Sequence, residues 1–361
     1  MHGHNRPPGR PATSMVAPVF MPLILSEAGA QQIHLPSLFR GLDIDALDFE
    51  SPDTLISHDD AISVVRRALQ YQPMAERGLE AGQRAKITER GALALGQLAA
   101  ATLGDAITLS VRFSQSAGHL LHMSEESSND VRLLVAEPFA GEELQERFLV
   151  DLTFAATVQM HRQIASTDYA PYTVELVREA PINAAAYAAF FRCSVRFGCQ
   201  RNVLSTHAEW LDFRLSWANA MASRMSARWL ERERERFSAM PAIAFSVERA
   251  IRRRLPEAAE IAQVAASLNL SERTLRRQLA QAGLNYRDLL DDGRRARAFN
   301  LMAAGDTPIA EISAAAGFSD PSAFTRAYRR WTGHPPSRQR SGQLDRPETN
   351  GPHALVSRRL A

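Results

Sequence analysis

Lysine is almost missing from this chain of 361 residues: Lys86 is the only one, so arginine carries the positive charge. The planar guanidinium of arginine pairs bidentately with guanine or phosphate, although a chain-wide excess of arginine is also produced by genomic base composition. Cysteine is limited to Cys193 and Cys199. Two thiols without a histidine cluster beside them give no disulfide framework and no metal site, and they indicate a reducing compartment. We therefore expect a cytoplasmic protein without a bound metal.

Long apolar runs are also missing, because no stretch approaches the ~18 residues that a membrane span needs. The segment Met15–Leu25 is apolar and follows two arginines, which is typical of a weak signal peptide. Pro18 and Pro22 interrupt it, so we favour a short helix over 22–32, with Met15 as an alternative start of translation. We expect no membrane partner.

The composition is that of an ordinary globular chain, with 45% apolar and 23% charged residues, and its length suggests about two domains. Composition and periodicity divide the chain into five ranges. We predict a disordered tail over 1–19, an α+β effector-sensing and dimerisation domain over 20–222, a charged helical linker over 223–244, an all-α domain over 245–340, and a disordered tail over 341–361.

The α+β prediction comes from mixed hydrophobic periods in the first two thirds. Ser57 is a predicted N-cap, His58 beside it is interpreted as a surface residue, and 142–165 is a predicted long helix with an apolar face. Segments that alternate or run apolar predict strands. These are 92–100, 119–124, 130–139, 172–179, 193–197 and 202–207.

Signatures of enzyme chemistry are missing from the same region. There is no glycine-rich phosphate loop and no nucleophile elbow, and the histidines have no metal-ligand spacing. We predict no catalytic residue and no cofactor. A small-molecule-modifying enzyme with an accessory helical domain, or an interaction module without sensing, remain the alternatives.

Positive charge is concentrated in the last third. From Arg249 to Arg340 there are 16 arginines, no lysine and nine acidic residues, a net charge of +7. Such a stretch suits a polyanion.

The last third contains two predicted pairs of helices that share one pattern of inward, capping and outward positions. In the first pair, the inner face of the first helix is formed by Ile261, Val264, Ala265 and Leu268. Ser271 caps the second helix, whose buried positions are Leu275 and Leu279. A generic antiparallel helix pair has the same apolar spacing, but it does not require arginines at the start of its second helix. The outward positions, which a helix-turn-helix places in the major groove, are Arg273, Thr274, Arg276 and Arg277.

In the second pair, Gly317 is the predicted left-handed end of one helix, and Ser319 or Asp320 caps the next, which Gly333 ends. The aromatic residues Phe324, Tyr328 and Trp331 form its buried stripe. The remaining outward face carries Ser322, Thr325, Arg326 and Arg329.

One helix over 286–304 is predicted to connect the two pairs. It contains Gly293, which costs ~1 kcal/mol relative to alanine in a helix interior, and Arg294, which we expect to bind phosphate. A rigid connector holds the two outward faces at about one DNA turn, roughly 34 Å, so that they enter successive major grooves.

The segments "AEIAQVAASLNLSERTLRRQLAQAG" and "PIAEISAAAGFSDPSAFTRAYRRWTGHPPSRQR" resemble the AraC/XylS-type transcriptional regulators over about a hundred residues. The first two thirds are more weakly similar to the arabinose-binding-type sensor domain of the ornithine-utilisation-regulator and VirS-like branch. The resemblance implies base contacts by Arg273, Arg276 and Arg277 and by Ser322, Thr325 and Arg326. It also implies a homodimer, a small effector bound to the N-terminal domain and, for an activator, contact with RNA polymerase. We therefore expect a sequence-specific regulator of transcription that binds double-stranded DNA, and an activator rather than a repressor.

Overall fold

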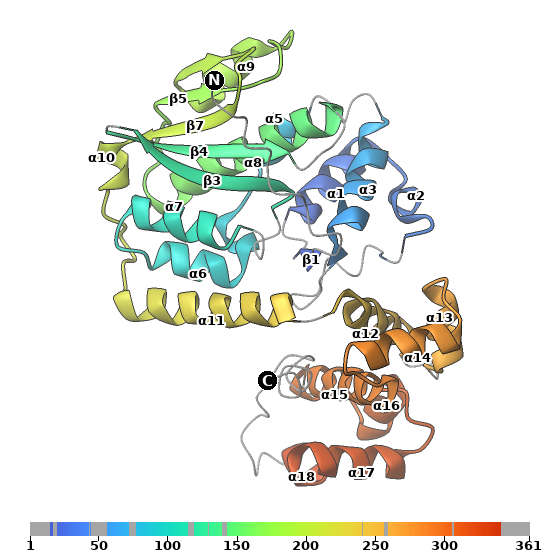
Figure 1. Ribbon diagram of the computed structural model, residues 1–361. Helices are drawn as coiled ribbons and strands as arrows, with labels where there is room; N and C mark the ends of the chain where they lie inside the picture. The colour runs from blue at the N-terminus through green and yellow to red at the C-terminus, as the bar shows by residue number, and fades with distance from the viewer. Residues whose placement is uncertain are drawn as a thin grey trace. The chain divides into compact units, whose positions relative to one another are not determined.

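The computed structural model describes residues 15–16, 20–42, 44, 56–71, 77–114, 119–128, 130–138, 143–239, 241–255, 259–304 and 307–340. The chain divides into two compact units, Met1–Glu235 and Arg236–Ala361 (Figure 1). Most of the two predicted tails lies outside the described residues. One part does not, because Met15–Val16, which we assigned to the first tail, forms strand β1 and pairs with β2 (Ile56–Ser57).

The first unit is built from a mixed sheet and helices, as the α+β prediction requires. Its central sheet has the order β3-β4-β7-β5-β6, in which only β5 and β6 run parallel. The strands of this sheet are β3 (Leu121–Ser128), β4 (Val131–Pro138), β5 (Thr173–Glu175), β6 (Ser194–Arg196) and β7 (Asn202–His207). The helices are α1 (Met21–Ala30), α2 (Leu35–Phe39), α3 (His58–Leu69), α5 (Gly78–Gln83), η2 (Ile87–Arg90), α6 (Ala92–Leu98), α7 (Leu103–Arg112), α8 (Glu143–Ile164), α9 (Ala184–Phe191), α10 (Ala208–Leu211) and α11 (Ala220–Ala239).

Helix α8 lies in the middle of this unit. The long helix predicted over 142–165 is confirmed. On its predicted apolar face, Phe148, Leu152, Ala155 and Val158 are all buried, and the side chain of Leu144 lies outside the described part. Helices α1 and α3 contact α5 and α8, and together they form one core with the sheet.

Helix α5 packs closely on α8 because glycines face it. A Cβ at Gly82 would lie 2.5 Å from the Leu152 carbonyl oxygen and 2.6 Å from the Ala155 Cβ, and one at Gly78 would lie 2.6 Å from the Phe148 carbonyl oxygen. The backbones therefore approach at a distance that only glycine permits.

We expect Gly82→Ala to lower the free energy of unfolding by about 1–3 kcal/mol, because the added methyl group meets backbone and must push the helices apart. Gly29→Ala is the matched control: Gly29 lies in α1 with nothing within 4 Å of its missing Cβ, so that variant should gain up to about 1 kcal/mol. Urea denaturation of the two variants measures this difference. Equal stabilities would contradict the close α5–α8 contact.

The prediction of a strand over 92–100 is wrong, since Ala92–Leu98 is helix α6. Its residues are apolar at nearly every position, so alternation and helical spacing fit equally well. The burial of the side chains distinguishes a helix from a strand here. Leu93 is 2% exposed, while Leu95, which a strand would place on the same face, is 65% exposed.

Two further interpretations are corrected in this unit. His58 is 2% exposed and not a surface residue, because the first turn of α3 directly follows β2 in the core; the Ser57 cap is confirmed by its acceptance of the Asp60 N–H at 3.0 Å. The charged linker predicted over 223–244 is not separate from the first unit along its whole length, because the segment around Ser226 and Leu230 is packed on it. Helix α11 packs on α6 and α7 through Leu230, and the Ser226 hydroxyl donates to the Ala92 carbonyl at 2.7 Å.

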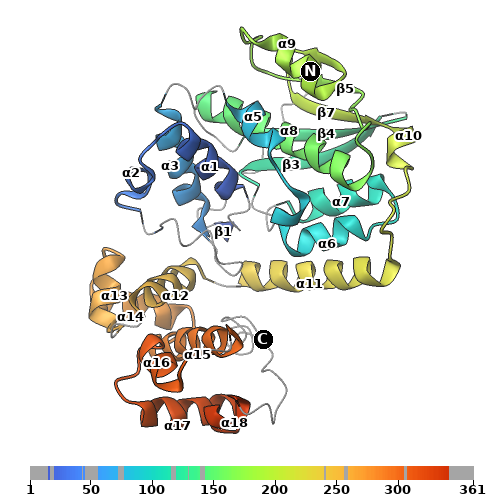
Figure 2. The ribbon, with the colours of Figure 1, turned by 180° about the vertical axis from the view of Figure 1, so that it is seen from behind.

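The described part of the second unit contains helices joined by turns, and no strand (Figure 2). The helices are α12 (Ala242–Arg254), α13 (Ile261–Ser267), α14 (Glu272–Gln281), α15 (Tyr286–Ala304), α16 (Ile309–Ala315), α17 (Pro321–Thr332) and α18 (Pro336–Arg340). Helices α13 and α14 form the first predicted pair, α16 and α17 form the second, and α15 lies between them in sequence. Within the described part of the chain, no helix is long and apolar enough to span a bilayer.

Candidate functional site

Helix α14 presents the first predicted polar face. Ser271 begins the helix by accepting the Thr274 N–H at 3.2 Å, and Leu275 and Leu279 are buried against its neighbours. Because these positions fix the rotation of the helix, Arg273, Arg276 and Arg277 lie on its exposed side. The predicted outward orientation of the three arginines is confirmed.

The polar groups of α14 differ in how they are engaged. The Arg276 guanidinium pairs with the Glu272 carboxylate one turn earlier, with 2.7 Å between Nη2 and Oε1. The Thr274 hydroxyl lies 2.8 Å from that of Ser271. Among the described residues, Arg273 and Arg277 have no ionic or hydrogen-bonded side-chain partner, so these two arginines are available to an anionic ligand without breaking any contact.

Helix α17 presents the second face, and its ends are set as predicted. Gly317 has φ +74° and Gly333 has φ +84°, both in the left-handed region that favours glycine. Of the two candidate caps, Asp320 is the one used, and it accepts the Ala323 N–H at 2.8 Å. That backbone hydrogen bond, with smaller contributions from Ser322 and Arg326, holds the pKa of Asp320 below its usual value.

Burial of Phe324 and Tyr328 turns the opposite face of α17 outward. Ser322, Arg326 and Arg329 are exposed there, while Thr325 is half-buried and its hydroxyl donates to the Pro321 carbonyl at 2.9 Å. Each of the two helices therefore carries arginines on one exposed face.

Helix α15 positions α17 through two of its side chains. Asp291 accepts from Arg330 at 2.6 Å and from the Trp331 indole N–H at 2.8 Å. Arg294 donates to the Gly317 carbonyl at 2.8 Å and lies over the Phe318 ring at 4.8 Å. Arg294 is thus engaged inside the unit, where it braces the turn between α16 and α17, and its predicted phosphate contact is not supported.

Gly293 is explained by the packing of the connector helix. It is buried, and a Cβ at this position would lie 3.0 Å from the Ile251 Cγ2 of α12. The glycine that weakens α15 by propensity therefore allows α12 to approach it closely. On the same side, the Tyr286 hydroxyl donates to the Ala259 carbonyl at 2.8 Å.

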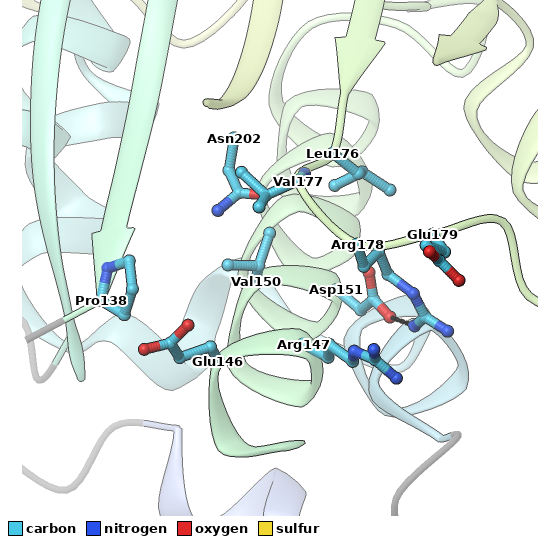
Figure 3. Close-up of a pocket in the computed structure, with 10 residues that line it drawn as sticks. All are labelled: Pro138, Glu146, Arg147, Val150, Asp151, Leu176, Val177, Arg178, Glu179 and Asn202. Carbon is cyan, nitrogen blue, oxygen red and sulfur yellow. Dashed lines mark hydrogen bonds and ion pairs between the residues drawn. The ribbon is translucent and has the colours of Figure 1, made fainter. Parts of the chain in front are cut away.

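A pocket of about 360 Å³ opens in the first unit, between α8, the end of β4 and the segment that follows β5 (Figure 3). Four of its lining residues are apolar and the others are charged or polar. The lining residues are Pro138, Glu146, Arg147, Val150, Asp151, Leu176, Val177, Arg178, Glu179 and Asn202.

A buried ion pair forms one wall of this pocket. The Arg178 Nη1 lies 2.6 Å from the Asp151 Oδ2, and the two side chains are 6% and 3% exposed. The Tyr187 hydroxyl donates to the same carboxylate oxygen at 2.6 Å. In the same segment as Arg178, the Val177 N–H donates to the Asn202 side-chain oxygen at 2.9 Å, and both residues are drawn in Figure 3. The wall is therefore held by hydrogen bonds before any ligand enters.

The charges of the lining do not cancel. Three carboxylates and two guanidiniums give the pocket a net charge of −1. Its described lining residues include no serine, cysteine or histidine, and they offer ionic and apolar contacts. The sequence did not predict this pocket, because its residues come from four separate segments; its only local signal is the run of charged residues after β5.

Two helix-turn-helix pairs in one helical unit, together with a separate α/β unit, define the class of helix-turn-helix transcriptional regulators. The model of the arabinose-binding domain of AraC transcription regulators matches residues 33–215, and that of a helix-turn-helix domain matches 264–342. The chain belongs to the AraC family of transcription regulators.

Proteins similar to this chain are also named as regulators. The ornithine utilization regulator of Pseudomonas aeruginosa is 26% identical over 263 residues, 72% of this chain and 77% of that protein. VirS of Mycobacterium tuberculosis is 31% identical over 161 residues, 44% of this chain and 46% of that protein. The crystal structure of CdpR from Pseudomonas aeruginosa aligns with a TM-score of 0.46 at 21% identity, covering 90% of this chain and 98% of that one.

Proposed function

We propose that this transcriptional regulator binds promoter DNA through α14 and α17 and that a small effector in the α8 pocket controls it. The observation that carries the proposal is the pair of capped helices, each with exposed arginines opposite a buried apolar face. Arginine paired bidentately with guanine O6 and N7 is the commonest specific contact in the major groove. The proposed set of DNA contacts is Arg273, Thr274, Arg276, Arg277, Ser322, Thr325, Arg326 and Arg329.

The two helices have different roles in this proposal. Arg273 and Arg277 contact DNA directly, whereas Arg276 must first leave the Glu272 carboxylate before it contacts a base. In the second helix Arg326 reads a base edge, Ser322 supports it, and Arg329 contacts phosphate. The chain acts as a homodimer and as an activator that contacts RNA polymerase, and it works in the cytoplasm without enzymatic activity.

The pocket supports a small effector that carries a positive charge. A volume of 360 Å³ equals about a dozen water molecules at ~30 Å³ each, which suits a ligand of amino-acid size. The net charge of −1 favours a cation, a guanidinium of the lining is of the charge that suits a carboxylate, and Val150 and Leu176 suit a short aliphatic chain. An amino acid with a second amino group meets these requirements. The name of the ornithine utilization regulator, which shares 26% of its aligned residues, agrees with this class of ligand.

We expect L-ornithine, L-lysine or L-arginine to raise the unfolding temperature of the full chain, and L-leucine to raise it less. A ligand that binds only the folded state stabilises it by RT ln(1 + [L]/Kd), about 2.7 kcal/mol at a hundredfold excess over Kd. Glu146→Gln removes one lining carboxylate and should weaken binding at least fivefold.

Glu209→Gln is the matched control, because Glu209 is exposed in α10 and is not part of the pocket. Equal shifts with the cationic and the neutral amino acids, or an unchanged affinity in Glu146→Gln, would contradict this choice of effector. Such a result would contradict only the effector assignment, and the proposed DNA binding by α14 and α17 would still stand.

A further inference from the structure

Glu272 is an acidic residue in the first turn of α14, next to the arginines that we propose as DNA contacts. It directly follows Ser271, the residue that caps the helix, so its carboxylate lies at the N-terminal end of α14. The N-terminal residues of a recognition helix are the ones that contact base edges. Glu272 is therefore placed where bases are read, although it is not part of the proposed set of DNA contacts.

The ion pair with Arg276 shows which face of α14 the Glu272 side chain occupies. Residues four apart lie on the same side of a helix, and two nitrogens of the Arg276 guanidinium approach one carboxylate oxygen. Nη2 lies 2.7 Å and Nε lies 2.9 Å from the Glu272 Oε1. The two side chains are 61% and 43% exposed, and exposed pairs of this spacing contribute little to stability. The pair can therefore open when DNA binds.

Opening the pair leaves the Glu272 carboxylate without a cation. In the part of the chain that the structure describes, Arg276 is the only cation paired with it. When Arg276 turns to a guanine, the carboxylate loses water near the phosphates, which is unfavourable unless a hydrogen-bond donor reaches it. The donors that bases present in the major groove are the amino groups of cytosine and adenine. Glutamate accepts from cytosine N4, whereas glutamine pairs with adenine N6 and N7.

The other proposed DNA-contacting helix is built differently. The first turn of α17 contains no acidic residue. The carboxylate of its cap, Asp320, accepts the Ala323 N–H and so satisfies the helix itself. An acid that pairs with a DNA-contacting arginine is thus a feature of α14 and is not needed to form a helix of this kind.

We propose that Glu272 is a specificity-determining residue that reads a cytosine. Away from the preferred DNA site it neutralises Arg276 and keeps the guanidinium from the phosphates. At the preferred site Arg276 moves to a guanine, and the Glu272 carboxylate accepts a hydrogen bond from the N4 amino group of a nearby cytosine. Four helical residues span ~6 Å and a base-pair step ~3.4 Å, which places that cytosine one or two base pairs from the guanine. The inference rests on the proposed DNA contacts and adds a base contact to them.

Selection of bound sites by the full chain, followed by titration of single-base variants, tests the proposal. The wild type should prefer cytosine about tenfold over the other bases at one position beside the guanine that depends on Arg276. Glu272→Gln should move this preference to adenine, and Glu272→Ala should abolish it. Glu311→Gln is the matched control and should change nothing, because Glu311 is an exposed acid in the first turn of α16, outside both sets of DNA contacts.

Binding to random-sequence DNA gives a second readout, which a purely structural role of Glu272 would not change. Glu272→Ala removes a negative charge and frees Arg276 for a phosphate. With one more phosphate contact, the plot of log affinity against log salt should become steeper by about 0.9, roughly an eightfold gain in affinity at 0.1 M salt. Thermal unfolding verifies that the variant is folded, and Glu272→Gln, which preserves the size of the side chain, replaces it if it is not.

Two results would each overturn the proposal. One is a wild type without a cytosine preference beside the guanine, or with one that both Glu272 variants retain. The other is an unchanged salt dependence in Glu272→Ala. In either case the guanine preferences that depend on Arg276 and Arg326 would remain, and the proposed DNA contacts would stand. If the wild type shows no base preference at any position, the proposed DNA contacts fail, and this inference fails with them.

Discussion

Arg276→Ala and Arg326→Ala should each weaken binding to the preferred DNA site by roughly 10- to 100-fold and relax the base preference at two separate places. A bidentate contact between arginine and guanine contributes about 1–3 kcal/mol of discrimination. Arg276 lies on α14 and Arg326 on α17, so the two relaxed positions should be about one helical turn of DNA apart. Selection of bound sites from a random library, followed by titration of single-base variants, measures both effects.

Arg287→Ala is the control for this pair, because Arg287 is an exposed arginine of α15 that belongs to neither face. It should leave base preference unchanged. If Arg276→Ala and Arg326→Ala weaken binding equally for all sequences, the arginines contact only phosphate and the model with two reading helices is wrong.

Asp151→Ala should lower the free energy of unfolding of the first unit by about 3–5 kcal/mol, because it leaves Arg178 charged and buried at the pocket wall. Asp151→Leu/Arg178→Met removes both charges and should recover most of that loss. Chemical denaturation followed by circular dichroism measures the free energy of unfolding of the wild type, the single variant and the double variant. A loss below about 1 kcal/mol in Asp151→Ala, or no recovery in the double variant, would show that the pair does not hold the wall together.

The exposed polar faces of α14 and α17 could be predicted from the sequence, because neighbouring residues determine the ends and the rotation of each helix. An aspartate cap and a glycine at φ +84° bound α17, and buried side chains at intervals of three and four set its rotation. The predicted bounds of the connector helix, 286–304, are those of α15. In each case the residues that determine the structure are neighbours in the chain.

The sequence was less informative where distant segments meet. Residues 92–100 read as a strand because apolar residues fill nearly every position, and only the packing of α6 on α7 and α11 selects the helix. The role of Arg294 depends on a carbonyl 23 residues away. The pocket combines β4, α8 and two later segments, so no local motif marks it.

A hydroxyl-radical footprint on the selected DNA site tests the central claim most directly. If α14 and α17 enter successive major grooves, one bound second unit should protect two patches on the same face of the DNA, about 10 base pairs apart. Arg276→Ala should reduce protection of one patch and Arg326→Ala that of the other. A single protected patch, reduced equally by both variants, would contradict the account.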